Sequence, residues 1–141
     1  MITILIIILL FTCLLALFEE RLGKIRWYVY TSLGILLIVL TATRPLGMDN
    51  DAENYEQYFL HYDDPINEMM VEYSFRLASK WLYHLFGDVH SIFLLYAVLG
   101  ISIKFAAIKK LTPLVLLAVV IYMGNYFILH EFTQIRAGVA S

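Results

Sequence analysis

Four long apolar runs constrain this chain more than any other feature of its sequence. They cover about residues 2–18, 27–43, 90–108 and 114–129, with charged patches between them. Because an α-helix rises about 1.5 Å per residue, runs of this length are candidates to cross the roughly 30 Å apolar core of a bilayer. The chain is 61% hydrophobic and only 16% charged, which lies outside the usual composition of soluble domains. We therefore predict one all-α membrane domain over residues 1–141, a polytopic bundle of four transmembrane helices.

The first apolar run has the length of a signal peptide, but its flanks oppose that interpretation. No basic residue precedes it, and Glu19, Glu20 and Arg21 behind it form no small-residue cleavage site. Cys13 is the only cysteine and cannot pair within the chain, which excludes disulfide and cysteine-based metal schemes. We expect no cofactor. The sequence stops at Ser141 without a closing element, so we expect it to be the front part of a longer protein.

The cations of the chain are distributed unevenly between the runs. Six of the ten Lys and Arg residues belong to one side: Arg21, Lys24, Arg26, Lys109 and Lys110 follow the first and third runs, and Lys104, near the end of the third, can snorkel toward the same side. The positive-inside rule places these loops in the cytoplasm, so residues 44–89 and 130–141 are expected on the non-cytoplasmic side. The formal net charge of −2 provides no basic field that would attract nucleic acid.

The outer segment 44–89 begins as a charged, turn-rich stretch and continues with a helical pattern. Asp64-Pro65 is typical of an N-cap followed by a first helical residue. Apolar residues then recur at steps of three and four: Ile66, Met70, Tyr73, Leu77, Trp81 and Leu85. The pattern predicts an amphipathic helix from Pro65 to about Phe86, lying on the outer membrane surface or against the bundle.

Two arginines lie in polar clusters on the predicted outer side. Arg44 precedes Gly47, and Arg136 lies between Gln134 and Gly138. Each arginine has two interpretations. It is either a membrane-edge cation paired with a nearby carboxylate, or a fixed, planar fork for an anionic group such as pyrophosphate. The sequence leaves both interpretations open.

The acidic residues of the outer segment also have alternative interpretations. Asp49, Asp51 and Glu53 have the hard oxygens that suit magnesium or calcium, but a solvated acidic loop is the favoured interpretation and we assign no metal site. One of these carboxylates would alternatively act as a general base on a sugar hydroxyl. A further charged series follows at four-residue spacing: Glu68, Glu72, Arg76 and Lys80. Its order, acid before base, is that of a solvated salt-bridge ladder on a helix.

The histidines give a weaker signal. His84, Asp88 and His90 would meet at a helix end, but Gly87 interrupts the geometry, so interfacial histidines are favoured over a zinc site. His130 lies where the fourth run leaves the membrane, a depth at which ionisable residues are often functional.

Short patterns of the chain occur in a specific order. They are Arg44-Pro-x-Gly47, Asp51-x-x-x-Tyr55-x-x-x-Phe59, Glu72-x-x-Phe75 and Gln134-Ile135-Arg136-x-Gly138-x-Ala140. In this order, and at the outer ends of the second and fourth runs, they resemble the EpsG family of Wzy-like bacterial polysaccharide polymerases. The resemblance covers essentially all of this chain but only about the first third to half of a family member.

The resemblance implies a multi-spanning enzyme of the bacterial inner membrane with its active face outside the cytoplasm. Such a glycosyltransferase-type polymerase joins repeat units carried on polyprenyl pyrophosphate into exopolysaccharide, capsule or O-antigen. The expected partners are the polyprenyl-pyrophosphate-linked oligosaccharide, membrane lipid and other membrane proteins of polysaccharide assembly. The fragment alone is expected to be inactive.

The resemblance also implies roles for individual residues. Arg44 and Arg136 match the motif arginines and would hold the pyrophosphate, and their charge would stabilise the leaving group. Asp51 and Glu72 match acidic positions and would orient or deprotonate the acceptor hydroxyl. Aromatic faces for sugar rings would come from Tyr55, Tyr58 and Phe59. The remaining residues of the expected substrate-binding set are Gly47, Asp49, His130, Gln134 and Gly138. The motif aspartate is either Asp49 or Asp51, because each satisfies one of the two spacings.

Two other classes of protein compete with the polymerase. One is a non-catalytic subunit or transporter for polysaccharide export, which would also have acidic outer loops and embedded arginines. A transporter predicts broken helices or inverted repeats, and the sequence contains neither. The other is a structural membrane fragment whose arginines pair with nearby carboxylates.

Overall fold

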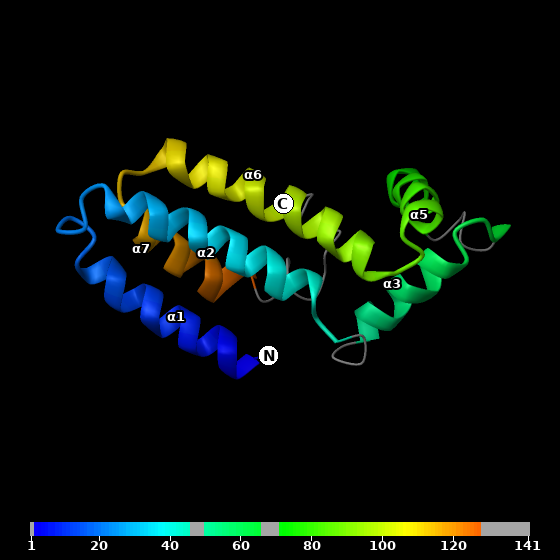
Figure 1. Ribbon diagram of the computed structural model, residues 1–141, viewed down its shortest axis with the longest axis horizontal. Helices are drawn as coiled ribbons and strands as arrows, with labels where there is room; N and C mark the ends of the chain where they lie inside the picture. Colours follow the sequence, from blue (N-terminus) through cyan, green and yellow to red (C-terminus); the bar gives the residue numbers. More distant parts are fainter. Residues whose placement is uncertain (1, 46–49, 66–70, 128–141) are drawn as a thin grey trace.

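The computed structural model describes residues 2–45, 50–65 and 71–127, and every regular element in these ranges is a helix (Figure 1). The helices in chain order are α1 Ile2–Leu17, α2 Ile25–Ala42, α3 Asn50–Leu60, α5 Tyr73–Leu85, α6 His90–Leu111 and α7 Val115–Tyr122. A π-helical turn extends α7 over residues 123–127. The all-α prediction is confirmed for the described part of the chain.

Four of the helices form a bundle, and two lie at one end of it. α1, α2, α6 and α7 run side by side, while α3 and α5 lie beyond the C-terminal end of α2 and the N-terminal end of α6 (Figure 1). Within the bundle, α2 packs mainly against α6 and α1 against α7. The α1–α2 and α6–α7 loops meet at the opposite end (Figure 1). The cation-rich loops and the α3/α5 region therefore lie at opposite ends of the bundle.

α2 and α6 approach each other closely because one residue of α2 has no side chain. A Cβ atom added at Gly34 would lie 3.0 Å from Cε1 of Phe105 in α6, so the ring occupies the space that a larger residue would fill. One turn earlier, the Tyr30 hydroxyl donates a hydrogen bond to the Phe105 carbonyl oxygen. Small residues at such contacts let helix backbones pack tightly where the hydrophobic effect adds little, as in a bilayer.

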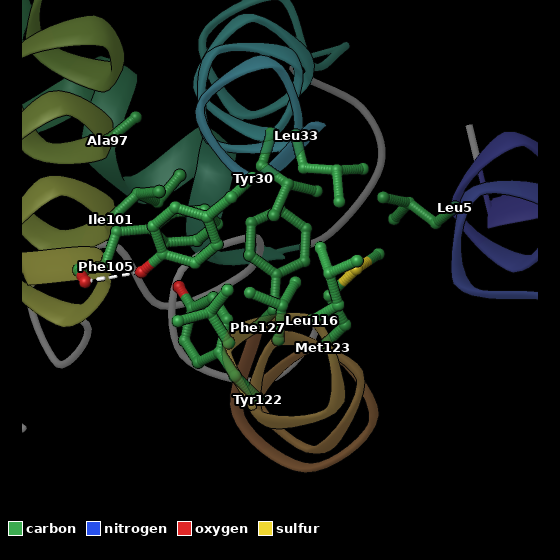
Figure 2. Packing of buried hydrophobic residues seen from close by; sticks show 13 residues of the cluster. Leu5, Tyr30, Leu33, Ala97, Ile101, Phe105, Leu116, Tyr122, Met123 and Phe127 are labelled. Carbon is green, nitrogen blue, oxygen red and sulfur yellow. Dashed lines mark hydrogen bonds between the residues drawn. The ribbon is translucent and has the colours of Figure 1, made fainter. Parts of the chain in front are cut away.

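The bundle core consists of aliphatic and aromatic side chains from all four helices. Leu33, Ile101 and Leu116 converge from α2, α6 and α7, and Leu5 of α1 points toward them (Figure 2). Most other apolar side chains of these helices are exposed, including Ile35 at 59% and Ile103 at 58%. An apolar exterior around a packed apolar interior is the pattern of a helix bundle that contacts lipid.

A buried carboxylate joins the two loops at the cation-rich end. Glu19, in the α1–α2 loop, is only 1% exposed, and its Oε1 and Oε2 accept hydrogen bonds from the backbone N–H groups of Leu116 and Leu117 at 3.0 and 3.2 Å. These are the second and third residues of α7, whose N–H groups have no partner within the helix. A negative charge at this position also interacts favourably with the helix dipole. No local pattern predicts this cap, because Leu116 and Leu117 lie 97 and 98 residues after Glu19 in the chain.

The prediction of four transmembrane helices needs correction. Among the described residues, two helices are long and apolar enough to cross a bilayer, α2 with 18 residues and α6 with 22. α1 has 16 residues and spans about 24 Å, short of the roughly 30 Å core. The apolar helix that contains α7 is described only as Val115–Phe127. The boundaries expected for runs two and three agree with α2 and α6 to within about three residues.

The predicted amphipathic helix from Pro65 to Phe86 is also wrong as one continuous element. Val71 and Glu72 are non-helical, and Glu72 has the extended backbone of an N-cap, with φ −60° and ψ 144°, so α5 starts at Tyr73. At this break Val71 is buried in the core that α3, α5 and α6 share, a tertiary contact that the apolar period did not indicate. α3, in the stretch read as turn-rich, was not predicted. The intervening residues 66–70, which include Glu68 of the predicted charge ladder, lie outside the described part.

Candidate functional site

The side chain of Arg44 is completely buried. It follows the end of α2 and is 0% exposed, with its guanidinium carbon 4.4 Å from the ring centroid of Phe93 in α6. Phe93 is itself fully buried one turn into α6. A cation over an aromatic face contributes about 2 kcal/mol when both groups are desolvated. Burial of a charged guanidinium otherwise costs free energy. The contact with Phe93 offsets part of this cost at the junction of α2 and α6.

Around Phe93 the structure assembles a compact aromatic cluster from three helices. Tyr55 of α3 lies 5.9 Å from Phe75 of α5 and 6.4 Å from Phe93, and Phe75 lies 5.8 Å from Tyr96 of α6. Phe59, four residues after Tyr55, is on the same face of α3 and is also fully buried. We call this group, with the apolar residues packed on it, the aromatic cluster. It brings together two of the segments that the sequence patterns single out, and Arg44, from a third, lies over its Phe93.

A cavity of about 870 Å³ lies beside the aromatic cluster, between α2, α5 and α6. Leu82 and Leu95 belong to both, because they line the cavity and pack against the cluster. The remaining wall is apolar along α2 and α6 and polar where these helices meet the α3/α5 region. Its residues are Val39, Ala42, Thr43, Phe86, Asp88, His90, Ser91, Leu94 and Val98. The lining is therefore mainly apolar, an open trough along α2 and α6 with a small polar end beside the α3/α5 region, which we call the polar mouth.

The polar mouth contains an oriented carboxylate–imidazole pair. Oδ1 of Asp88 accepts hydrogen bonds from the backbone N–H of His90 at 3.0 Å and from its Nδ1 at 2.9 Å. The Ser91 hydroxyl donates to the Asp88 carbonyl oxygen at 2.6 Å. The two hydrogen bonds from His90, the side-chain bond first, lower the pKa of Asp88 below its ordinary value. An ionised carboxylate only accepts, so Nδ1 carries a proton, and in the neutral form of the imidazole the lone pair is then on Nε2.

Phe93 links this pair to the buried arginine. The His90 ring stands edge-on to the Phe93 ring with centroids 6.0 Å apart, and the Arg44 guanidinium lies over the same phenylalanine. The two contacts join side chains of the first turn of α6 with Arg44, the second residue after the end of α2. The structure thus brings Arg44, Phe93, His90 and Asp88 together at one end of the bundle.

The expected site residues are distributed unevenly between the described and the remaining parts of the chain. Tyr55 and Phe59 are core residues at 5% and 0% exposure, and Tyr58 is half-buried against the same cluster. Glu72 is exposed immediately before α5, and Asp51 lies in the first turn of α3. Phe59 presents no free face to a sugar in this structure, so the stacking role stays a prediction. Outside the described residues lie Gly47, Asp49, His130, Gln134, Arg136 and Gly138.

In the sequence analysis, Asp88 and His90 were weighed together with His84 as ligands of a zinc site, and interfacial histidines were favoured instead. Among the described residues, no group of three or more histidine, cysteine, aspartate or glutamate side chains is placed to hold a metal. His84 instead has Nδ1 2.9 Å from the carbonyl oxygen of Lys80, and its ring packs against Tyr62. The missed signal was the short spacing Asp-x-His at the start of an apolar run.

The described part of the chain is all-helical, with two candidate membrane spans and a mainly apolar cavity at one end of its bundle. Comparison with known families shows which one: the model of the EpsG family matches residues 27–141, and the chain belongs to this family. Comparisons with curated proteins and with solved structures gave no match. Family membership and the two candidate spans indicate a membrane protein related to polysaccharide biosynthesis.

Proposed function

We propose that the full-length protein is a membrane-embedded glycan polymerase. It would join repeat units carried on polyprenyl pyrophosphate into a polysaccharide such as exopolysaccharide, capsule or O-antigen. The reaction forms a glycosidic bond between an acceptor hydroxyl and the anomeric carbon of the donor sugar. The bond from that carbon to the pyrophosphate breaks, and polyprenyl pyrophosphate leaves with the electron pair.

The observation that carries this proposal is the mainly apolar cavity between α2, α5 and α6, with its polar mouth. Its apolar trough, lined by Val39, Leu94 and Val98, suits part of an isoprenoid chain. Its polar mouth, with Asp88 and His90, suits a headgroup where sugars react. Ligand sites generally combine an apolar wall with a few convergent polar groups. A lipid-linked sugar has the same division into apolar chain and polar head.

The buried position of Arg44 supports an electrostatic role rather than direct binding of the pyrophosphate from the solvent side. In this structure its charge reaches the site across Phe93, because the guanidinium is 0% exposed. A fixed cation in a water-poor environment stabilises negative charge that develops nearby on a leaving pyrophosphate. Direct contact with the lipid would need Phe93 to move. In the proposal Arg136 supplies the second cation.

The two ends of the bundle support a sidedness for the enzyme. Arg21, Lys24 and Arg26 lie in the α1–α2 connection or the start of α2, and Lys109 and Lys110 end α6 at the same end of the bundle (Figure 1). By the positive-inside rule this end is cytoplasmic. The α3/α5 region and the cavity mouth would then face the non-cytoplasmic side of the bacterial inner membrane.

The test is polymer synthesis by the purified full-length protein in proteoliposomes that contain the lipid-linked repeat unit of the same bacterium. The proposal expects a ladder of products with increasing numbers of repeat units and release of polyprenyl pyrophosphate. Repeat units that cross the membrane without forming new glycosidic bonds would instead identify a transporter. If neither polymer nor translocation is observed, the remaining interpretation is a non-catalytic export subunit.

A further inference from the structure

The polar mouth of the cavity contains His90, whose ring is oriented by a hydrogen bond to the Asp88 carboxylate. We propose that His90, held by Asp88, is the general base that deprotonates the acceptor hydroxyl. The inference rests on the proposed function, which supplies the hydroxyl, and it deepens that function by assigning its proton acceptor. The sequence patterns had favoured Asp51 or Glu72 for this role.

The geometry assigns different tasks to the two ring nitrogens. Nδ1 lies 2.9 Å from Oδ1 of Asp88 and is therefore the protonated nitrogen. Among the described residues, no hydrogen bond engages Nε2, which holds the lone pair of the ring. The His90 side chain is 41% exposed and lines the cavity, so a hydroxyl in the mouth can reach it. A carboxylate that fixes the tautomer and direction of a catalytic imidazole is a recurring arrangement in enzymes.

Two further observations support the pair as a working unit. Asp88 is an ionised acceptor for Nδ1 at neutral pH, and the hydrogen bonds from His90 lower its pKa further below the ordinary value. Its backbone position is also fixed, because Oδ1 accepts from the His90 N–H and the Ser91 hydroxyl donates to its carbonyl oxygen. Side chains held in this way lose little freedom when substrate binds, which favours catalysis.

The proposed step balances without a cofactor. The acceptor oxygen attacks the anomeric carbon of the donor while its proton moves to Nε2 of His90. The carbon–oxygen bond to pyrophosphate breaks, and the leaving group takes the electron pair. The imidazolium that forms is stabilised by the Asp88 carboxylate and later releases its proton to solvent. Arg44, in contact with Phe93 beside His90, stabilises the negative charge on the departing pyrophosphate.

The test compares three variants of the full-length protein in the polymerisation assay. His90→Asn retains an N–H that can donate to Asp88 but lacks a base, so kcat is expected to fall by about 100-fold or more while KM changes little. His90→Ala opens space at the same position, and added imidazole is expected to restore part of its activity. His84→Ala is the matched control, because His84 is also an exposed histidine at a helix end, with Nδ1 near a backbone oxygen. It is expected to retain wild-type activity.

The role of Asp88 is tested by Asp88→Asn. Asparagine caps helices about as well as aspartate, so the start of α6 is expected to fold as before and the melting temperature to fall only slightly, by the loss of the ionised carboxylate. Loss of the carboxylate is nevertheless expected to lower kcat by about 10-fold or more, because the imidazolium loses its counter-charge.

The outcomes separate this inference from the polymerase proposal. Wild-type kcat in His90→Asn overturns the inference and leaves the polymerase standing. Loss of activity in His90→Ala that imidazole does not restore assigns His90 a structural role and also overturns it. Absence of polymer from the wild-type protein overturns the polymerase, and the inference falls with it.

Discussion

The bundle and its α3/α5 end have cores of different residue composition. In the bundle, α2, α6 and α7 bury mainly aliphatic residues, and the apolar exterior faces outward. At the α3/α5 end, an aromatic cluster surrounds a buried arginine, and a cavity opens beside it. The bundle has the composition needed to sit in lipid. A buried cation, a carboxylate–imidazole pair and a cavity therefore occur together at this end, a combination that suits chemistry as well as packing.

The largest effect is expected from Arg44→Lys, which targets the α3/α5 end. Lysine retains the charge but loses the planar, weakly hydrated group that lies over Phe93. On the polymerase account, polymer synthesis falls by about 100-fold or more while membrane insertion is unchanged. Arg136→Lys is expected to act in the same way. Polymer yield and length in cells, with insertion measured in parallel, check both variants.

The matched control for this prediction is Arg26→Lys. Arg26 also lies over an aromatic ring, that of Trp27 at 5.2 Å, but at the cation-rich end of the bundle. Its replacement is expected to leave polymer length unchanged. Equal losses in Arg26→Lys and Arg44→Lys would remove the functional distinction between the two ends.

A smaller effect, on stability, is expected from Gly34→Leu in the bundle. The new Cβ would lie 3.0 Å from Phe105, and the rest of the side chain would force α2 and α6 apart. Overpacking of this kind costs about 1–3 kcal/mol. Gly124→Leu is the control, because a Cβ there meets nothing within 4 Å. Unfolding in detergent measures both, and equal stability of the two variants would show that the close α2–α6 contact contributes nothing.

Removal of the buried cap by Glu19→Ala is expected to cost about 1–2 kcal/mol. The substitution deprives Leu116 and Leu117 of the acceptors at 3.0 and 3.2 Å and leaves N–H groups at the start of α7 without partners. Glu20→Ala, at the exposed neighbouring residue, serves as the control and is expected to be neutral. Hydrogen exchange at the start of α7 locates the effect, and unchanged protection in Glu19→Ala would contradict the capping role.

The smallest effect concerns pH at the start of α6. The pKa of Asp88 is lower in the folded protein than its ordinary value near 3.9, so its contribution to stability is fully present above about pH 4. The contribution is lost as the pH falls through the folded pKa, when the carboxyl gains a proton and loses its bonds from His90. Hydrogen exchange in the first turn of α6, followed from pH 6 to pH 3, is expected to increase beyond the intrinsic change in rate. In Asp88→Asn this additional increase is expected to be absent.

The bundle was more predictable from sequence than the α3/α5 end. The apolar runs located α2 and α6 because length and hydrophobicity alone define a span. The same runs overcounted the spans, since α1 is a 16-residue helix in the structure. Nothing in a run of apolar residues predicted the Glu19 cap, which depends on a loop that the fold brings to α7.

At the other end, tertiary contacts decide the local structure. α3 is rich in acidic and amide side chains and forms a helix whose buried face consists of Tyr55 and Phe59. The helical period through Tyr73 and Leu77 was real, but Val71 and Glu72 are non-helical, so α5 starts later than the pattern indicated. The order of the patterns identified Arg44 as a candidate, and the structure adds Phe93 and His90 as its neighbours. A cavity shared by three helices has no signature in the sequence.

Photo-crosslinking tests most directly whether the cavity is the lipid-donor site. A photoreactive phenylalanine derivative would replace Leu94, which lines the cavity, or Ile103, which is exposed elsewhere on α6. With the full-length protein in membranes that contain the lipid-linked repeat unit, the account predicts a glycan-bearing adduct at position 94, suppressed by excess unlabelled substrate, and little at position 103. Equal, non-competable labelling at the two positions would show ordinary contact with membrane lipid and would contradict the account.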